Sequence, residues 1–199
     1  MAENQVINLY TESNPNPNSL KFVANFMLVN EGENHDFRTV ESAANSPLAQ
    51  RLFELPYVEG VFFMSNFVTV TKTAETDWYE VKGEVQELIK SYLETGASLV
   101  NESAAEAPAM PEIGKTESAA STADLEQKIV GILDEYIKPA VEMDGGAIAF
   151  HSFNEGTVKV TLQGSCSGCP SSTVTLKAGI ENLLKRMVPE VETVEAEGI

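Results

Sequence analysis

Two cysteines separated by two residues are the side chains of this sequence best suited to chemistry. They stand in the run Cys166-Ser167-Gly168-Cys169, and the 199-residue chain holds no other cysteine. Thiolates are nucleophiles and ligands for soft metals, and this spacing lets both sulfurs turn toward one point. Gly168 helps such a loop to curl because glycine readily adopts positive φ. The motif predicts either dithiol chemistry or a metal or cluster site at Cys166 and Cys169.

The flanking residues place this motif between a strand and a helix. Val158, Val160 and Leu162 alternate with polar residues, which predicts a strand paired in a hairpin with AIAFHSF just upstream. Pro170 then opens a helix, and the positive end of a helix dipole stabilises thiolates. We expect the loop to lie exposed at the surface, so that replacing either cysteine by serine changes stability by no more than about 0.5 kcal/mol.

A CxxC motif alone leaves several interpretations open. Thiol–disulfide exchange is one, although a thioredoxin-like motif follows a strand of a parallel βαβ unit and the strand before Cys166 belongs to an expected hairpin. Structural zinc needs four protein ligands, but we expect His35 in a solvated loop and His151 on the surface of a strand. Zinc shared between two chains stays open, and burial of two structural thiols fits poorly with a Gly- and Ser-rich loop. An iron–sulfur cluster is a further interpretation. Hydroxyl donors that could reach its sulfides or the cysteine sulfurs are Ser165, Ser167, Ser171 and Ser172.

The pattern of the whole chain predicts two small α+β domains joined by a linker. Residues 96–121 are rich in Ala, Ser, Glu and Pro without apolar periodicity, which predicts a flexible acidic linker. The domains before and after it are residues 1–95 and 122–199. In the first, strand patterns cover residues 20–28 and 60–72 and helix patterns cover 46–55 and 78–92. In the second, a helix with a capping box at Ser121 stops near Pro139, and the hairpin, the motif helix and a short strand over VETVEAE follow.

Composition argues against two classes of partner. The net charge is −17 and no segment is basic, so the chain lacks the electrostatic footprint of a nucleic-acid-binding protein. No apolar run approaches the roughly 18 residues of a membrane span, and the first residues carry no leader pattern. The paired cysteines do not resemble a secreted disulfide framework, so we expect a reducing compartment and a cytoplasmic location. A processed organelle protein would show the same pattern, and this alternative stays open.

Three stretches carry a resemblance to a known family: GSCSGCPSSTVTLKAGIENLLKRMVPEVETVEA around the cysteines, VEMDGGAIAF before them, and TESNPNPNSLKF near the start. They resemble the NifU-like (Nfu) iron–sulfur proteins, with an Nfu-type N-terminal domain and a C-terminal NifU-like domain. The resemblance implies an α+β fold in both domains and one [4Fe–4S] cluster held by Cys166 and Cys169 of two subunits. Ala147 departs from the family pattern, in which an acidic residue commonly follows the two glycines.

The function implied by the resemblance is that of a scaffold or carrier rather than an enzyme. Such a homodimer, bridged by its cluster, would receive the cluster from an upstream assembly scaffold and pass it to apo iron–sulfur proteins by ligand exchange. A [2Fe–2S] form is left open, and neither nucleic acid nor membrane is an implied partner. The alternative function is a thiol–disulfide oxidoreductase that uses Cys166 and Cys169 as its dithiol.

Overall fold

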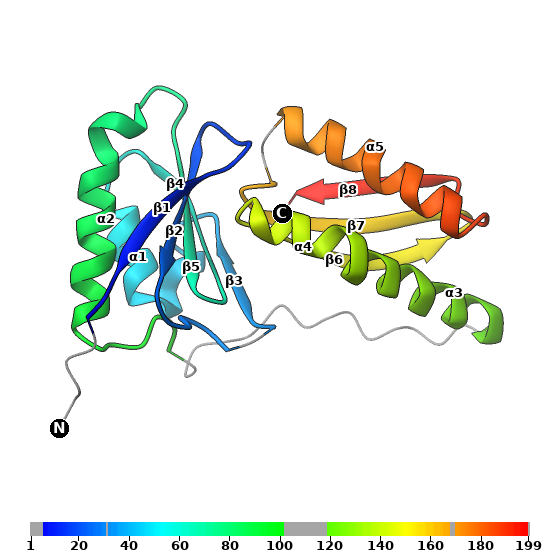
Figure 1. The fold of residues 1–199 in the computed structure, drawn as a ribbon, viewed down its shortest axis with the longest axis horizontal. Helices are drawn as coiled ribbons and strands as arrows, with labels where there is room; N and C mark the ends of the chain where they lie inside the picture. Colours follow the sequence, from blue (N-terminus) through cyan, green and yellow to red (C-terminus); the bar gives the residue numbers. More distant parts are fainter. Residues whose placement is uncertain (1–5, 31, 102–118, 168–169, 199) are drawn as a thin grey trace. The chain divides into compact units, whose positions relative to one another are not determined.

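The structure is a computed structural model that describes residues 6–30, 32–101, 119–167 and 170–198 (Figure 1). The chain divides into two compact units, Met1–Ala105 and Glu106–Ile199. Each unit combines helices with one β-sheet and encloses its own hydrophobic core. The α+β fold class is therefore confirmed.

The N-terminal unit is a five-stranded sheet with two helices on one face (Figure 1). Its strand order is β1-β2-β5-β4-β3, and every neighbouring pair is antiparallel. Alternate side chains of the strands, such as Phe22 and Phe63, meet Leu52 and Ile89 of the helices in a fully buried core. The elements are β1 (Leu9–Ser13), β2 (Ser19–Ala24), β3 (Asn34–Phe37), α1 (Pro47–Phe53), β4 (Val58–Met64), β5 (Phe67–Lys72) and α2 (Trp78–Glu94).

Both helices of this unit begin at a side-chain cap. The hydroxyl of Ser46 accepts from the Ala49 N–H, with Pro47 next to the cap, and the carboxylate of Asp77 accepts from the Tyr79 N–H. A turn at Ser65, whose φ is +50°, joins β4 to β5. The two predicted helices and the predicted pair of strands are confirmed.

Two strands of this unit were not predicted, and one of them holds His35. His35 lies on β3 opposite Phe63, and its side chain is 24% exposed. The expectation of a solvated loop residue is therefore wrong. The surrounding sequence is polar because β3 is an edge strand in which Phe37 is the one fully buried residue. Partial burial lowers the pKa of His35, although the nearby carboxylate of Glu33 acts in the opposite direction.

The chain stays attached to the N-terminal unit beyond Gly96, where the predicted linker starts. The hydroxyl of Ser46 donates to the Leu99 carbonyl at 2.6 Å, and the Asn101 N–H donates to the Asn45 carbonyl at 2.8 Å. Leu99 itself packs in the core. Residues 102–118 lie outside the described residues, so for them the linker stays a prediction.

The C-terminal unit is a three-stranded sheet with its helices on one face (Figure 1). The strand order is β6-β7-β8, with β6 antiparallel and β8 parallel to the central β7. Val158, Val160 and Leu162 of β7 are buried in the core with Ile129 and Ile180 of the helices, which confirms the predicted alternation. The elements are α3 (Ala119–Ile132), α4 (Lys138–Met143), β6 (Gly146–Asn154), β7 (Thr157–Gly164), α5 (Pro170–Met187) and β8 (Thr193–Gly198).

The first helical region of this unit is longer than predicted at both ends. It begins at Ala119, so Ser121 lies inside the helix and the predicted capping box is wrong. It also continues past Pro139, through a π-helical turn, Leu133–Ile137, into α4. Pro139 falls in the first turn of α4, directly after the π-helical turn. No helix in the described part of the chain is both long and apolar enough to span a bilayer.

Candidate functional site

Cys166 lies in a loop that runs alongside the turn between α4 and β6. The loop begins where β7 ends at Gly164, whose φ of +65° turns the chain, and α5 starts shortly after it at Pro170. Gly146, the first residue of β6, is the register partner of Gly164. The end of the hairpin therefore brings the turn at Asp144 and Gly145 beside the cysteine loop.

Gly146 and Cys166 approach each other too closely for a side chain at position 146. A Cβ atom built on Gly146 would lie 2.9 Å from the Sγ of Cys166 and 2.6 Å from the main-chain carbonyl oxygen of Gln163. Both distances are shorter than real Cβ contacts, and the second atom belongs to the backbone, which cannot rotate away. Position 146 must therefore be glycine if Cys166 is to keep this place.

Hydrogen bonds tie the loop to the neighbouring turn and to itself. The Ser165 hydroxyl donates to the Asp144 carbonyl, and the Ser165 N–H donates to the Gly145 carbonyl at 3.3 Å. The Ser167 hydroxyl donates to the Gly164 carbonyl at 2.8 Å. The hydroxyls of these two serines thus donate to main-chain carbonyls, and Ser165 also lies within reach of the Cys166 sulfur, as the sequence allowed. The side chains of Ser171 and Ser172 lie outside the described residues.

Cys166 is buried, in contrast to the exposed loop that the sequence suggested. Its exposed fraction is 4%, and it belongs to the hydrophobic core of the C-terminal unit. Ser165 and Ser167 are 2% and 7% exposed. A cysteine thiol packs as a small apolar group, and the missing side chain of Gly146 leaves the room for it. Cys169 lies outside the described residues, so its position and exposure stay predictions.

Ser165 also contacts the Cys166 sulfur. The Ser165 Oγ lies 3.8 Å from the Cys166 Sγ, and either atom could donate. A hydroxyl has one hydrogen, and a carbonyl can only accept. While Ser165 donates to Asp144, the thiol of Cys166 is therefore the donor toward Ser165.

Neither histidine adds to a metal site in the described part of the chain. Among these residues, no three side chains of the types His, Cys, Asp and Glu gather closely enough to hold a metal ion. His35 belongs to β3 of the N-terminal unit, and His151 is exposed on β6, with its Nδ1 3.2 Å from the Ser152 hydroxyl. The strand position expected for His151 is confirmed.

The strand before the motif does not discriminate between redox and cluster chemistry as expected. β7 does form a hairpin with β6, but through α5 it also forms a parallel β7-α5-β8 crossover with β8. The CxxC motif therefore follows a strand that has a parallel partner, as in thioredoxin-like proteins. The argument from the hairpin alone is wrong, because the pairing of the last strand could not be predicted.

The sequence pointed to the cysteines but not to the role of the turn before β6. Gly146 and the carbonyls of Asp144 and Gly145 form the floor on which the loop rests. The adjacent glycines of VEMDGGAIAF were the available signal. Ala147, the departure from the family pattern, is buried on β6 opposite Gln163, at the edge of this floor.

Comparison with known proteins connects both units to one family. The family described as "Scaffold protein Nfu/NifU N terminal" matches residues 9–96, and the family described as "NifU-like domain" matches residues 129–195. A solution structure of a NifU-like protein from Saccharomyces cerevisiae is 27% identical, with a TM-score of 0.46, and covers 51% of this chain and 91% of that chain.

Curated relatives match across both units. Proteins from Drosophila willistoni and Drosophila ananassae, each named "NFU1 iron-sulfur cluster scaffold homolog, mitochondrial", are 40% and 39% identical over 187 residues, or 94% of this chain. This chain spans 62% and 63% of the length of these two relatives. With its two matched domains in the order that the sequence predicted, the chain belongs to the NifU-like (Nfu) family.

Proposed function

We propose that this protein is an iron–sulfur cluster carrier that holds a [4Fe–4S] cluster as cargo on Cys166 and Cys169 and passes it to apo iron–sulfur proteins. The observation that carries the proposal is the fitted place of Cys166: Gly146 leaves room for its sulfur, and Ser165 and Ser167 fasten the loop on either side. The names of the relatives, which describe iron–sulfur cluster scaffolds, support the same cargo.

Two subunits share one cluster in this proposal. A [4Fe–4S] cluster is usually held by four cysteine thiolates, and the chain has two cysteines. The described residues offer no group of three His, Cys, Asp or Glu side chains that could complete the set within one chain. Cys166 and Cys169 of each subunit then supply the four ligands, and the homodimer forms around the cluster.

Transfer proceeds by ligand exchange without a change in the cluster core. A thiolate of the recipient forms a bond to iron as the bond from iron to a carrier cysteine breaks, and the carrier thiolate takes up a proton from solvent. Because Cys166 is buried, the loop must open before a recipient can replace this ligand. Opening must break bonds that tie the loop to the turn before β6, which include those from the Ser165 hydroxyl to Asp144 and from the Ser165 N–H to Gly145. These ligand-exchange steps need no general acid or base, so in this proposal the protein acts as a carrier rather than an enzyme.

Replacing each cysteine by serine and reconstituting the full chain anaerobically with iron and sulfide tests this function. Wild-type protein should show the broad brown absorption of an iron–sulfur cluster, and both single variants should lose stable binding. Full cluster retention by both Cys166→Ser and Cys169→Ser would refute the assignment. A dithiol oxidoreductase would instead stay colourless after reconstitution and reduce a disulfide catalytically.

The stability of the Cys166 variants separates loss of a ligand from loss of packing. Serine in this apolar place should cost about 1–3 kcal/mol, more than the surface value of 0.5 kcal/mol or less that an exposed loop would show. Cys166→Ala removes the ligand and adds no hydroxyl, so it should be the more stable of the two variants. Urea unfolding of both apo-proteins measures the difference.

The partners and location follow from the same proposal. The donor is an upstream assembly scaffold, and the recipients are apo iron–sulfur proteins with unoccupied thiolates. We place the protein in the cytoplasm, whereas the two Drosophila relatives are named mitochondrial. Immunodetection of the native protein in separated cell fractions tests this location, and recovery in an organelle fraction would contradict it.

A further inference from the structure

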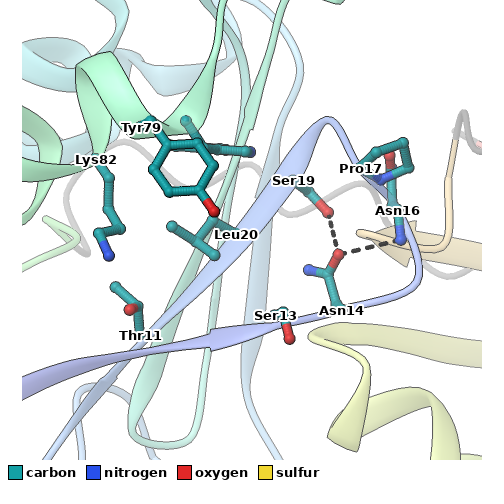
Figure 2. A pocket seen from close by; sticks show the side chains of 10 residues that line it. Thr11, Ser13, Asn14, Asn16, Pro17, Ser19, Leu20, Tyr79 and Lys82 are labelled. Atoms are coloured by element: carbon teal, nitrogen blue, oxygen red, sulfur yellow. Dashed lines mark hydrogen bonds between the residues drawn. The ribbon is translucent and has the colours of Figure 1, made fainter.

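The N-terminal unit contains a hollow of about 410 Å³ between the edge strand β1 and the start of α2 (Figure 2). This volume lies within the range of roughly 300–1,000 Å³ that is usual for small-molecule sites. The hollow is lined by Thr11 and Ser13 of β1, Leu20 of β2, the first turns of α2 and the turn between β1 and β2. Nothing in cluster binding uses this place.

Asn14 presents a buried hydrogen-bond donor in this hollow. Its Oδ1 accepts from the Asn16 N–H at 3.2 Å and from the Ser19 hydroxyl at 3.0 Å, which determines the orientation of the amide (Figure 2). In Figure 2 the amide nitrogen points to the side on which Thr11 and Lys82 lie. This nitrogen is buried and has no hydrogen-bond partner among the described residues. A ligand that accepts a hydrogen bond would satisfy it.

Trp78 presents a second donor of the same kind. Its indole Nε1 is also buried without a partner in the described part of the chain, and Trp78 lines the same hollow. An indole nitrogen can only donate. A buried donor without a partner is destabilising, so two of them among the residues that line one hollow call for an explanation. An acceptor group that enters the hollow and displaces the side chains covering the two nitrogens would satisfy both donors.

The charges around the hollow favour an anion. Lys82 lines it, and none of the residues that line it is Asp or Glu, in a chain with a net charge of −17. The hollow also lies at the N-terminus of α2, the positive end of the helix dipole, where the carboxylate of the N-cap Asp77 offsets part of the charge and Lys82 adds to it. Leu20 and the aromatic rings of Trp78 and Tyr79 add apolar surface. The site therefore combines donors and positive charge with room for an apolar group.

We propose that this hollow binds a carboxylate attached to an apolar group. The carboxylate oxygens accept from the Asn14 amide, the Trp78 indole and the Lys82 ammonium, while the apolar part packs beside Leu20. A small organic acid and the free C-terminus of a peptide offer this same chemistry. The site is independent of the cluster site, so its test does not require the cluster.

The indole N–H of Trp78 reports binding directly, because Trp78 is the single tryptophan of the chain. We would titrate the ¹⁵N-labelled full chain with N-acetyl-leucine and, as a matched probe without the charge, with N-acetyl-leucinamide. The acid should shift the indole resonance to lower field and saturate, while the amide should bind at least tenfold more weakly. No saturable shift with the acid, or equal binding of acid and amide, would overturn the proposal.

Two variants test the donors, and a third serves as control. Asn14→Asp keeps the acceptor oxygen for Asn16 and Ser19 but replaces the donor by a carboxylate oxygen. Both Asn14→Asp and Lys82→Gln should weaken the acid at least tenfold, whereas Lys90→Gln, on the same helix but outside the hollow, should not. Wild-type affinity in Lys82→Gln overturns the proposal. Lys82 is exposed, so this variant should fold and gives a result even if Asn14→Asp does not fold.

The source of the carboxylate is distinguished with a peptide probe. Acetyl-Ala-Ala-Leu with a free C-terminus and N-acetyl-leucine end in the same group. Tighter binding of the peptide by tenfold or more indicates a chain terminus as the natural ligand, and equal affinity indicates a small acid. Both results support carboxylate recognition, and failure of both probes to bind rejects it.

Discussion

The sulfur of Cys166 lies 2.9 Å from the point where any side chain on Gly146 would begin. Gly146→Ala must therefore displace the cysteine loop, the Gln163 carbonyl or both. We predict a loss of about 1–3 kcal/mol in the free energy of unfolding, typical of overpacking in a core, together with a loss of cluster occupancy. Urea unfolding of the apo-protein and iron analysis after reconstitution measure the two effects.

Gly179→Ala is the matched control for this substitution. A Cβ atom on Gly179, within α5, meets nothing within 4 Å. Alanine is a better helix former than glycine by about 1 kcal/mol, so this variant should be as stable as wild type or more stable, and should bind the cluster fully. If Gly146→Ala is as stable as Gly179→Ala and binds the cluster as fully, the absence of a side chain at Gly146 has no part in placing Cys166.

Ser165→Ala should loosen the cysteine loop without removing a ligand. It deletes the buried hydrogen bond from Ser165 to the Asp144 carbonyl, worth about 0.5–1.5 kcal/mol net. We predict a lower free energy of unfolding and faster loss of iron to a chelator. In Ser98→Ala, an exposed hydroxyl that donates to the Val100 carbonyl is removed, and this variant should match wild type in both measurements. Equal rates of iron loss in the two variants would show that Ser165 does not hold the loop closed.

His35 should make the stability of the N-terminal unit depend on pH. Burial lowers its pKa in the folded state below the ordinary 6.5. The unfolded chain then takes up a proton on His35 at a higher pH than the folded chain does. The contribution of neutral His35 to the free energy of unfolding is therefore complete above about pH 6.5 and is lost as the pH falls through the pKa of the folded state. Urea unfolding between about pH 7.5 and pH 5 should show a shallower pH dependence in His35→Gln than in wild type. The same pH dependence of the unfolding free energy in both proteins would contradict a lowered pKa of His35.

Much of the fold was predictable because local patterns agree with the tertiary structure. Ser46 and Asp77 cap helices, and the alternation of Val158, Val160 and Leu162 marks a half-buried strand. The polar strand β3 was missed because its place is set by pairing with β4, a contact made far along the chain. The parallel pairing of β8 with β7 was likewise not encoded in any local pattern.

The sequence singled out the candidate cysteines, but the environment of Cys166 was not predictable from it. The spacing of the cysteines identified Cys166, yet its burial depends on Gly146, which a different strand supplies. The sequence allowed the hydroxyls of Ser165 and Ser167 to reach a sulfur, and in the structure both donate to main-chain carbonyls, those of Asp144 and Gly164. Such competition between partners is decided by tertiary geometry and has no signature in the order of the residues.

The proposal depends most directly on the number of chains that share one cluster. Each chain has two cysteines, so a [4Fe–4S] cluster with four thiolate ligands must join two chains. Sedimentation combined with iron analysis of the reconstituted protein should show a dimer with about four irons per two chains, and a chelator should return it toward the monomer. A reconstituted protein that stays monomeric with about four irons per chain would contradict the shared cluster.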